Sequence, residues 1–108
     1  MGRTLAVRLD SDGDVLLCGP ALTLLAETGD EVDLLVSSQG LAAAGLLPAV
    51  SEVLVYDAPW SGFRPPPVDR AATAELVERI ASRGYDRAVV FTSFHQSPLP
   101  MALLLRLA

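Results

Sequence analysis

Short apolar segments alternate with helix-like segments along the whole chain, and this alternation constrains the fold more than any other feature of the sequence. The strand-like segments are rich in Val and Leu and cover residues 5–9, 31–37, 52–57 and 86–92. Helix-like patterns cover residues 14–27, 38–47 and 70–83, and a last one begins near Leu99. Such an alternation predicts an α/β fold, with a Rossmann-like parallel sheet and helices on both of its faces.

Asp, Pro and Gly residues set the expected boundaries of these elements. Asp14 is expected to begin the first helix, and Pro20 inside it predicts a kink or a late start. Asp69 is expected to cap the third helix, which Gly84 ends. Residues 58–68, APWSGFRPPPV, are too rich in Pro and Gly to form a helix or a strand.

The expected strand order is 3-2-1-4, from right-handed crossovers and the usual doubly wound topology. In that order the chain reverses direction between the first and fourth strands, and open α/β sheets bind ligands at such a switch point. The loop after the first strand contains Asp10, Asp12 and Asp14, and the loop after the fourth contains His95, the only histidine. We therefore expect the three aspartates and His95 to meet at one crevice.

Size and charge limit the classes of function. The chain has 108 residues, enough for one domain, and its 8 basic residues, all of them Arg, stand against 13 acidic ones. An acidic chain has no general attraction to nucleic acid, which is not an expected partner. Cys18 is the only cysteine, so we expect it to be a small buried residue in a cytoplasmic protein. The apolar segment at the end, PMALLLRLA, suggests part of a longer protein.

The run RLDSDGDVLLCGPAL has several interpretations. An EF-hand calcium loop would need Gly and Glu where this chain has Val15 and Ala21. A strand followed by D-x-D resembles the haloacid-dehalogenase superfamily of Mg²⁺-dependent phosphohydrolases, in which Asp10 would be the nucleophile and Asp12 the acid/base. In the simplest interpretation, Asp14 caps a helix and the other two aspartates are solvated turn residues.

The same run also resembles the amino-terminal motif of the family 9 glycosyltransferases, the ADP-heptose:lipopolysaccharide heptosyltransferase type. The matching residues form a Gly–Asp pair and the apolar helix with a proline that follows it: Gly13, Asp14, Val15, Leu16, Leu17 and Pro20. EVDLLVSSQGLAAAGLLPAVSEVLVYDAPW and GYDRAVVFTSFHQSPLPMALLL resemble later segments of the family, in the same order. The resemblance therefore spans nearly the whole chain.

This resemblance implies that residues 1–108 are the amino-terminal, acceptor-side domain of a GT-B glycosyltransferase, whose carboxyl-terminal donor domain is absent from this chain. It implies inverting, metal-independent transfer from a nucleotide-sugar such as ADP-heptose, bound by that missing domain, to a hydroxyl of a glycan or glycolipid acceptor. Asp14 would be the general base, because the attacking alcohol must lose its proton. The expected acceptor-binding residues are Arg8, Asp10, Asp12, Gly13, His95 and Gln96.

The chain departs from the heptosyltransferase pattern at both loops of the expected site. The loop TSFHQS has no Gly and no Arg or Lys, and Asp10 and Asp12 precede the Gly–Asp pair. A strongly anionic acceptor, such as the inner core in lipopolysaccharide biosynthesis, is therefore not expected, although a glycolipid acceptor would still imply peripheral contact with a membrane. Trp60 and Phe63 are candidates for a sugar-stacking platform, or for aromatic residues that pin their loop to the core.

No cofactor or metal is expected. GDVLLCGP is not the G-x-G-x-x-G pattern of dinucleotide-binding loops, and no cluster of metal-ligating residues stands out. Besides the transferase and the phosphohydrolase, a non-catalytic Rossmann-like binding module remains an alternative for the function of this chain.

Overall fold

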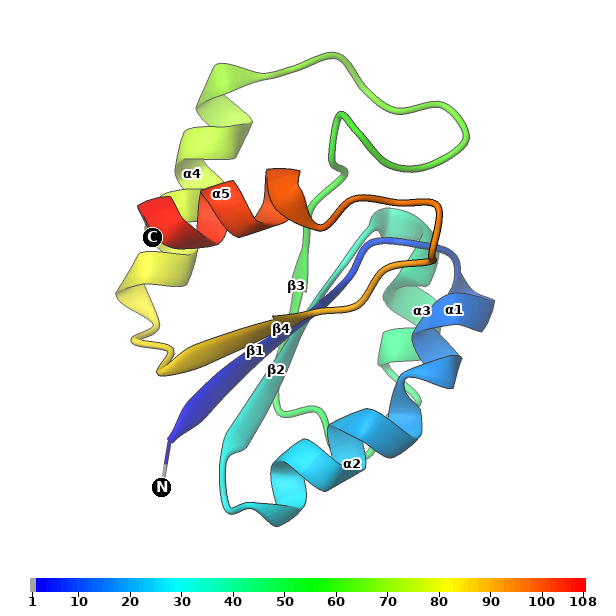
Figure 1. The fold of residues 1–108 in the computed structure, drawn as a ribbon, viewed down its shortest axis with the longest axis vertical. Helices are drawn as coiled ribbons and strands as arrows, with labels where there is room; N and C mark the ends of the chain where they lie inside the picture. The colour runs from blue at the N-terminus through cyan, green and yellow to red at the C-terminus, as the bar shows by residue number, and fades with distance from the viewer. Residues whose placement is uncertain (1) are drawn as a thin grey trace.

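The computed structural model describes residues 2–108, which form one sheet covered by helices on both faces (Figure 1). The strands are β1 (Arg3–Arg8), β2 (Glu31–Val36), β3 (Val53–Val55) and β4 (Arg87–Val90). All of them are parallel and they lie in the order β3-β2-β1-β4. The predicted α/β fold, with a Rossmann-like sheet in the order 3-2-1-4, is confirmed.

The helices form two layers. One face of the sheet is covered by α1 (Asp12–Leu17), α2 (Gly19–Glu27), the 3-10 helix η1 (Ser38–Gly40) and α3 (Leu41–Ala44), and the other by α4 (Arg70–Ser82) and α5 (Leu99–Leu107). Side chains alternate along the strands: Leu5 and Val7 of β1 pack toward α4 and α5, whereas Ala6 packs toward α1 and α2. Because both faces are covered, the strands read as nearly continuous apolar runs.

Several helix boundaries follow the sequence signals. Asp69 caps α4, and its Oδ1 accepts a hydrogen bond from the backbone N–H of Ala72 at 3.1 Å. Gly84 follows the end of that helix with φ +66°, a left-handed conformation that glycine adopts without strain. Pro20 lies in the first turn of α2, which begins at Gly19. Since proline has no N–H to donate, α1 and α2 are separate helices.

Two of the predicted helices differ from the structure. The first helix begins at Asp12 rather than Asp14, because Ser11 is still extended and is the N-cap residue. Both aspartates therefore lie in the first turn, where the helix dipole favours carboxylates. The helix predicted over residues 38–47 is shorter, since a 3-10 turn precedes α3 and the helix ends at Ala44. Bonds to residues three positions back tighten the turn that follows.

The carboxyl ends of the strands meet at one edge of the sheet, because all the strands are parallel. The loops after β1 and β4 and the long connection between β3 and α4 lie along this edge (Figure 1). Residues 58–68 of that connection contain no helix or strand, as the sequence predicts. In open α/β sheets, ligands bind at this edge.

Candidate functional site

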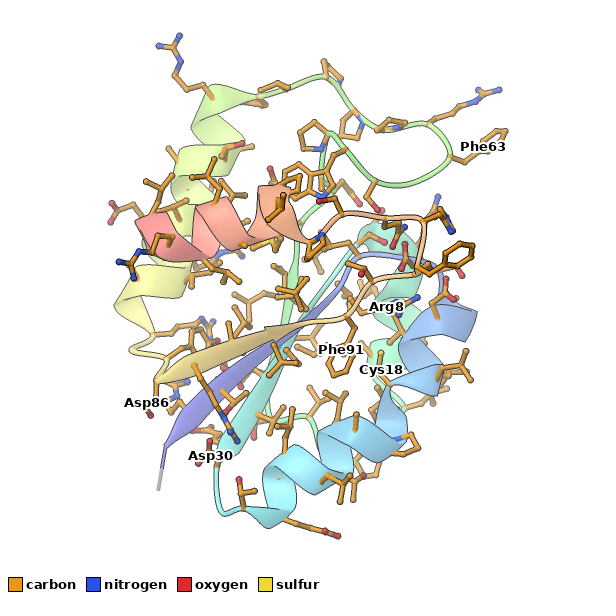
Figure 2. All side chains as sticks on the ribbon, viewed as in Figure 1. Arg8, Cys18, Asp30, Phe63, Asp86 and Phe91 are labelled. Atoms are coloured by element: carbon orange, nitrogen blue, oxygen red, sulfur yellow. The ribbon has the colours of Figure 1, made fainter. Side chains whose placement is uncertain are left out.

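Arg8 is the centre of a polar cluster between α1 and the loop after β4 (Figure 2). Its Nε lies 2.8 Å from Asp10 Oδ2, and its Nη2 lies 3.4 Å from Asp14 Oδ1. The same nitrogen donates a hydrogen bond to Ser93 Oγ at 3.1 Å. The side chain of Arg8 is only 12% exposed, so its charge interacts mainly with these protein groups.

Asp10 and Gln96 join the loops after β1 and β4. Gln96 Nε2 donates to Asp10 Oδ1 at 2.6 Å, and Gln96 Oε1 accepts from the backbone N–H of Ser93 at 3.0 Å. Because Arg8 contacts the other oxygen, the carboxylate of Asp10 has partners on both sides, and its side chain is 11% exposed. Asp10 is therefore not a solvated turn residue, and the two loops meet at the switch point as the strand order predicts.

Asp12 and Asp14 share the first turn of α1 but differ in their contacts. Asp12 Oδ1 accepts from the backbone N–H of Ala43 at 3.0 Å, which ties α1 to α3. The side chain of Asp14 is 37% exposed, and its Oδ2 accepts from Ser11 Oγ at 3.2 Å. A Cβ added to Gly13 would meet nothing within 4 Å, so the backbone beside Asp14 is open to close approach. Asp14 is thus an oriented but accessible carboxylate.

A cavity of about 400 Å³ opens beside this cluster, between the loops after β1 and β4 and the beginning of α5. Its floor is apolar and includes Val7, Val90 and Met101. Its polar lining consists of Asp10, Ser61, Thr92, His95, Gln96 and Ser97. Three predicted site residues therefore line the cavity, whereas four lie outside its lining: Arg8, Asp12, Gly13 and Asp14. Arg8 links the two groups, because it contacts both Asp10 and Asp14.

Trp60 lines the same cavity and is held by the core and by β1. Its ring centroid lies 6.0 Å from that of the buried Tyr56, with the two planes at 55°. The next residue, Ser61, donates from Oγ to the carbonyl oxygen of Leu9 at 3.2 Å, just after β1. Trp60 nevertheless keeps 36% of its surface exposed. Its loop is therefore fixed while one part of the indole stays available to a ligand.

The two aromatic residues of this loop lie in different surroundings. Phe63 does not line the cavity that contains Trp60 and is 89% exposed, at the outer turn of the loop (Figure 2). It lines an adjoining cavity of about 250 Å³ together with Asp57 and Arg64. Phe63 therefore does not pin the loop to the core, which was one of the two roles expected for it.

Gly40 allows the close contact that positions α1. A Cβ on this residue would lie 2.7 Å from Val15 Cγ2 and 3.2 Å from the carbonyl oxygen of Asp10. The same carbonyl accepts a hydrogen bond from Ser37 Oγ at 3.3 Å. Because only glycine leaves this space, η1 packs directly against the loop after β1 and fixes the start of α1.

Cys18 follows the end of α1 and is 5% exposed, as expected for a small buried residue (Figure 2). Burial raises the pKa of its thiol, and the nearby guanidinium of Arg8 offsets this only in part. Cys18 therefore lacks the features of a reactive nucleophile. Within residues 2–108, no group of three or more His, Cys, Asp or Glu side chains is arranged to hold a metal ion.

Ser93 and Ser61 fix the site although the sequence patterns do not single them out. Ser93 accepts from Arg8 and donates to Gln96, so it connects the cluster to the loop after β4. A usable signal exists for this residue, since it is a hydroxyl side chain just beyond a strand that ends at the switch point. No sequence pattern predicts the bond from Ser61 to Leu9, because the two residues are far apart in an irregular loop and at a strand end.

None of the helices in residues 2–108 combines the length and the apolar character needed to span a bilayer. The chain matches no family model, and no curated protein is similar enough to it to count as a relative.

Proposed function

We propose that this chain is the acceptor-binding domain of an inverting glycosyltransferase with GT-B architecture, in which Asp14 is the general base. The observation that carries the proposal is the position of Asp14. It is a partly exposed carboxylate beside the unobstructed Gly13, and Arg8 connects it to a cavity at the switch point of the sheet. The resemblance of this Gly–Asp motif to family 9 glycosyltransferases supports the reaction type.

In the proposed reaction, a hydroxyl of a glycan or glycolipid acceptor attacks the anomeric carbon of a nucleotide-sugar that is held by a donor domain. The new bond joins the acceptor oxygen to that carbon while the bond from the carbon to the phosphate oxygen breaks. The nucleoside diphosphate leaves with its electron pair, and the configuration at the anomeric carbon inverts. Asp14 accepts the proton of the hydroxyl as the new bond forms.

The neighbours of Asp14 suit this role. Arg8 contacts Oδ1 and the Ser11 hydroxyl contacts Oδ2, so the carboxylate is oriented from two sides. Each carboxylate oxygen has two lone pairs, which leaves acceptor capacity for the proton of a bound hydroxyl. Asp14 also lies in the first turn of α1, where the positive end of the helix dipole attracts a carboxylate.

The phosphohydrolase alternative finds less support in the contacts of its two aspartates. Asp10 interacts with Arg8 and Gln96, whereas Asp12 accepts from the backbone of α3. Two carboxylates that shared a Mg²⁺ ion and a phosphate would instead converge on one position. A cytoplasmic location is part of the transferase proposal, because the chain's single cysteine cannot form an internal disulfide.

The deciding experiment compares Asp14→Asn with the unmodified protein in the enzyme that joins this chain to its donor domain. We expect the release of nucleoside diphosphate in the presence of acceptor to fall by about 10²–10⁴-fold, the usual contribution of a general base. Glu27→Gln, which removes an exposed carboxylate at the end of α2, is the control and should leave the rate unchanged. Near-normal turnover of Asp14→Asn would overturn the assignment of Asp14 as the general base, whereas no turnover in the unmodified protein would favour a binding module.

A further inference from the structure

We infer that the acceptor bound at this site is an uncharged saccharide, one ring of which occupies the cavity against Trp60. This inference rests on the proposed function, and it specifies the chemical class of the acceptor. The reasons are the chemistry of the cavity lining, the distribution of charge around it and the fixed position of the indole.

The cavity offers both kinds of surface that a sugar ring presents. Its volume of about 400 Å³ lies within the range of small-molecule sites, roughly 300–1,000 Å³. A pyranose has an apolar face of C–H groups, which packs on an aromatic ring, and hydroxyls around its edge. The exposed part of Trp60 supplies the aromatic surface. The amide, hydroxyl, imidazole and carboxylate groups of the lining supply both donors and acceptors of hydrogen bonds.

The charge around the cavity disfavours an anionic ligand. Asp10 is the only Asp or Glu among the lining residues, and none of them is an Arg. The guanidinium of Arg8, which contacts Asp10, is buried between two carboxylates, and a phosphate would have to compete with both of them. A phosphate in the cavity would therefore face the carboxylate of Asp10 with no Arg among the lining residues, which is electrostatically unfavourable.

Arg64 lies close enough to the site to provide a control for the charge of the ligand. It lines the adjoining smaller cavity with Asp57, and it does not line the cavity of Trp60. An anionic acceptor that extended into the smaller cavity would be expected to pair with Arg64, whereas a neutral acceptor would not depend on this residue. The variant Arg64→Gln therefore separates the two classes of acceptor.

The indole is also positioned before any ligand binds. Tyr56 packs against it, and the bond from Ser61 to Leu9 holds its loop at the end of β1. A preformed surface of this kind avoids the cost of ordering a loop on binding. Phe63 belongs to the same loop but lies outside the cavity, so Phe63→Ala is a matched control for Trp60→Ala.

The test uses the ¹⁵N-labelled 108-residue chain, whose spectrum reports folding and binding together. The probes are the methyl glycosides of glucose, galactose and mannose and the corresponding 6-phosphates. We expect at least one neutral glycoside to shift the side-chain amide of Gln96 and the indole N–H of Trp60, the only tryptophan. Its 6-phosphate should bind about fivefold more weakly at low salt, because of repulsion by Asp10.

The variants complete the test. Trp60→Ala should weaken binding of the neutral glycoside by about tenfold, while Phe63→Ala and Arg64→Gln should leave it unchanged. Tighter binding of a 6-phosphate that Arg64→Gln abolishes would overturn the inference and leave the transferase proposal intact. Failure of every probe to bind the folded chain would also overturn it. The transferase proposal is tested separately, by the turnover of Asp14→Asn.

Discussion

The two ends of the sheet both carry clusters of charged side chains, but the central carboxylates of these clusters, Asp33 and Asp14, differ in their exposure. At the amino end, Asp33 of β2 is completely buried. Its carboxylate accepts from Tyr85 Oη at 2.6 Å and from the backbone N–H of Glu52 at 3.2 Å. The guanidinium groups of Arg3 and Arg83 lie at 3.3 and 3.7 Å. Both oxygens of the Asp33 carboxylate therefore accept hydrogen bonds, and the group is shielded from solvent.

The same end of the sheet has a second set of closed contacts. Asp30 accepts from the backbone N–H of Gly2 and from Thr4 Oγ1, and it pairs with Arg87 of β4 (Figure 2). The hydrogen bond from Thr4, more than any other contact, lowers the pKa of Asp30. These bonds connect the beginnings of β1, β2 and β4, so the amino end acts as a structural clamp.

The carboxyl end differs because its cluster is open. Arg8 and Asp10 form a largely buried ion pair, but Asp14 is 37% exposed and a cavity lies next to the pair. The comparison teaches that a charged cluster indicates chemistry only when a titratable group keeps access to a ligand. Burial with complete pairing, as at Asp33, indicates a contribution to stability.

The largest effect expected from this difference is on stability. Asp33→Asn removes the charge that two guanidinium groups share and should lower the free energy of unfolding by about 3 kcal/mol. Asp14→Asn removes a partly exposed carboxylate and should cost less than about 1 kcal/mol. Urea denaturation of both variants measures the difference. Equal losses in the two variants would contradict the division of the molecule into a clamp and an open site.

Much of this architecture is predictable because it depends on periodicity and topology. The strand order brings Asp10 and His95 to one cavity, as the sequence predicts, but the expected meeting of all three aspartates with His95 is not observed, because Asp12 and Asp14 do not line that cavity. The clamp at the amino end of the sheet is not predicted, because EVDLLVS has the pattern of an ordinary buried strand. A signal was nevertheless present: an aspartate in the middle of a buried strand requires partners from elsewhere in the chain.

Other details depend on how separate elements approach each other. The bond from Ala43 to Asp12 exists because α3 packs beside the first turn of α1, and local sequence does not encode that distance. The start of α1 at Asp12 depends on the extended backbone of Ser11. In the same way, the availability of Trp60 follows from a contact between an irregular loop and the end of β1. Such tertiary contacts are beyond pattern-based prediction.

The next effect concerns Tyr85 and alkaline pH. Burial, and then the hydrogen bond to Asp33, raise the pKa of Tyr85 well above its usual value near 10. Because the phenol ionises more easily in the unfolded chain, its contribution to stability is complete below about pH 10 and is lost as the pH rises through the folded pKa. Urea midpoints measured from pH 7 to pH 11 should therefore fall at the alkaline end.

The variant Tyr85→Phe tests this explanation. At pH 7 the free energy of unfolding of this variant should be about 1.5 kcal/mol lower than that of the unmodified chain, the value of a hydrogen bond to a charged group. Above about pH 10 its stability should fall less steeply than that of the unmodified chain, because the phenol is gone. Parallel pH profiles of the two proteins would assign the alkaline loss to another group and would weaken the description of the clamp.

The smallest effect is expected at Glu52, the exposed member of the clamp, which pairs with Arg83. The hydrogen bond from Arg83, and then its charge, lower the pKa of Glu52. A depressed pKa contributes stability above the unfolded value near 4.3, and that contribution is lost as the pH falls through the folded pKa. Glu52→Gln should therefore be slightly less stable at pH 7 and indistinguishable from the unmodified chain near pH 3. Because the side chain of Glu52 is 56% exposed, added salt should shrink the difference at pH 7. If Glu52→Gln lowered the free energy of unfolding as much as Asp33→Asn, burial would not determine how much each clamp residue contributes to stability.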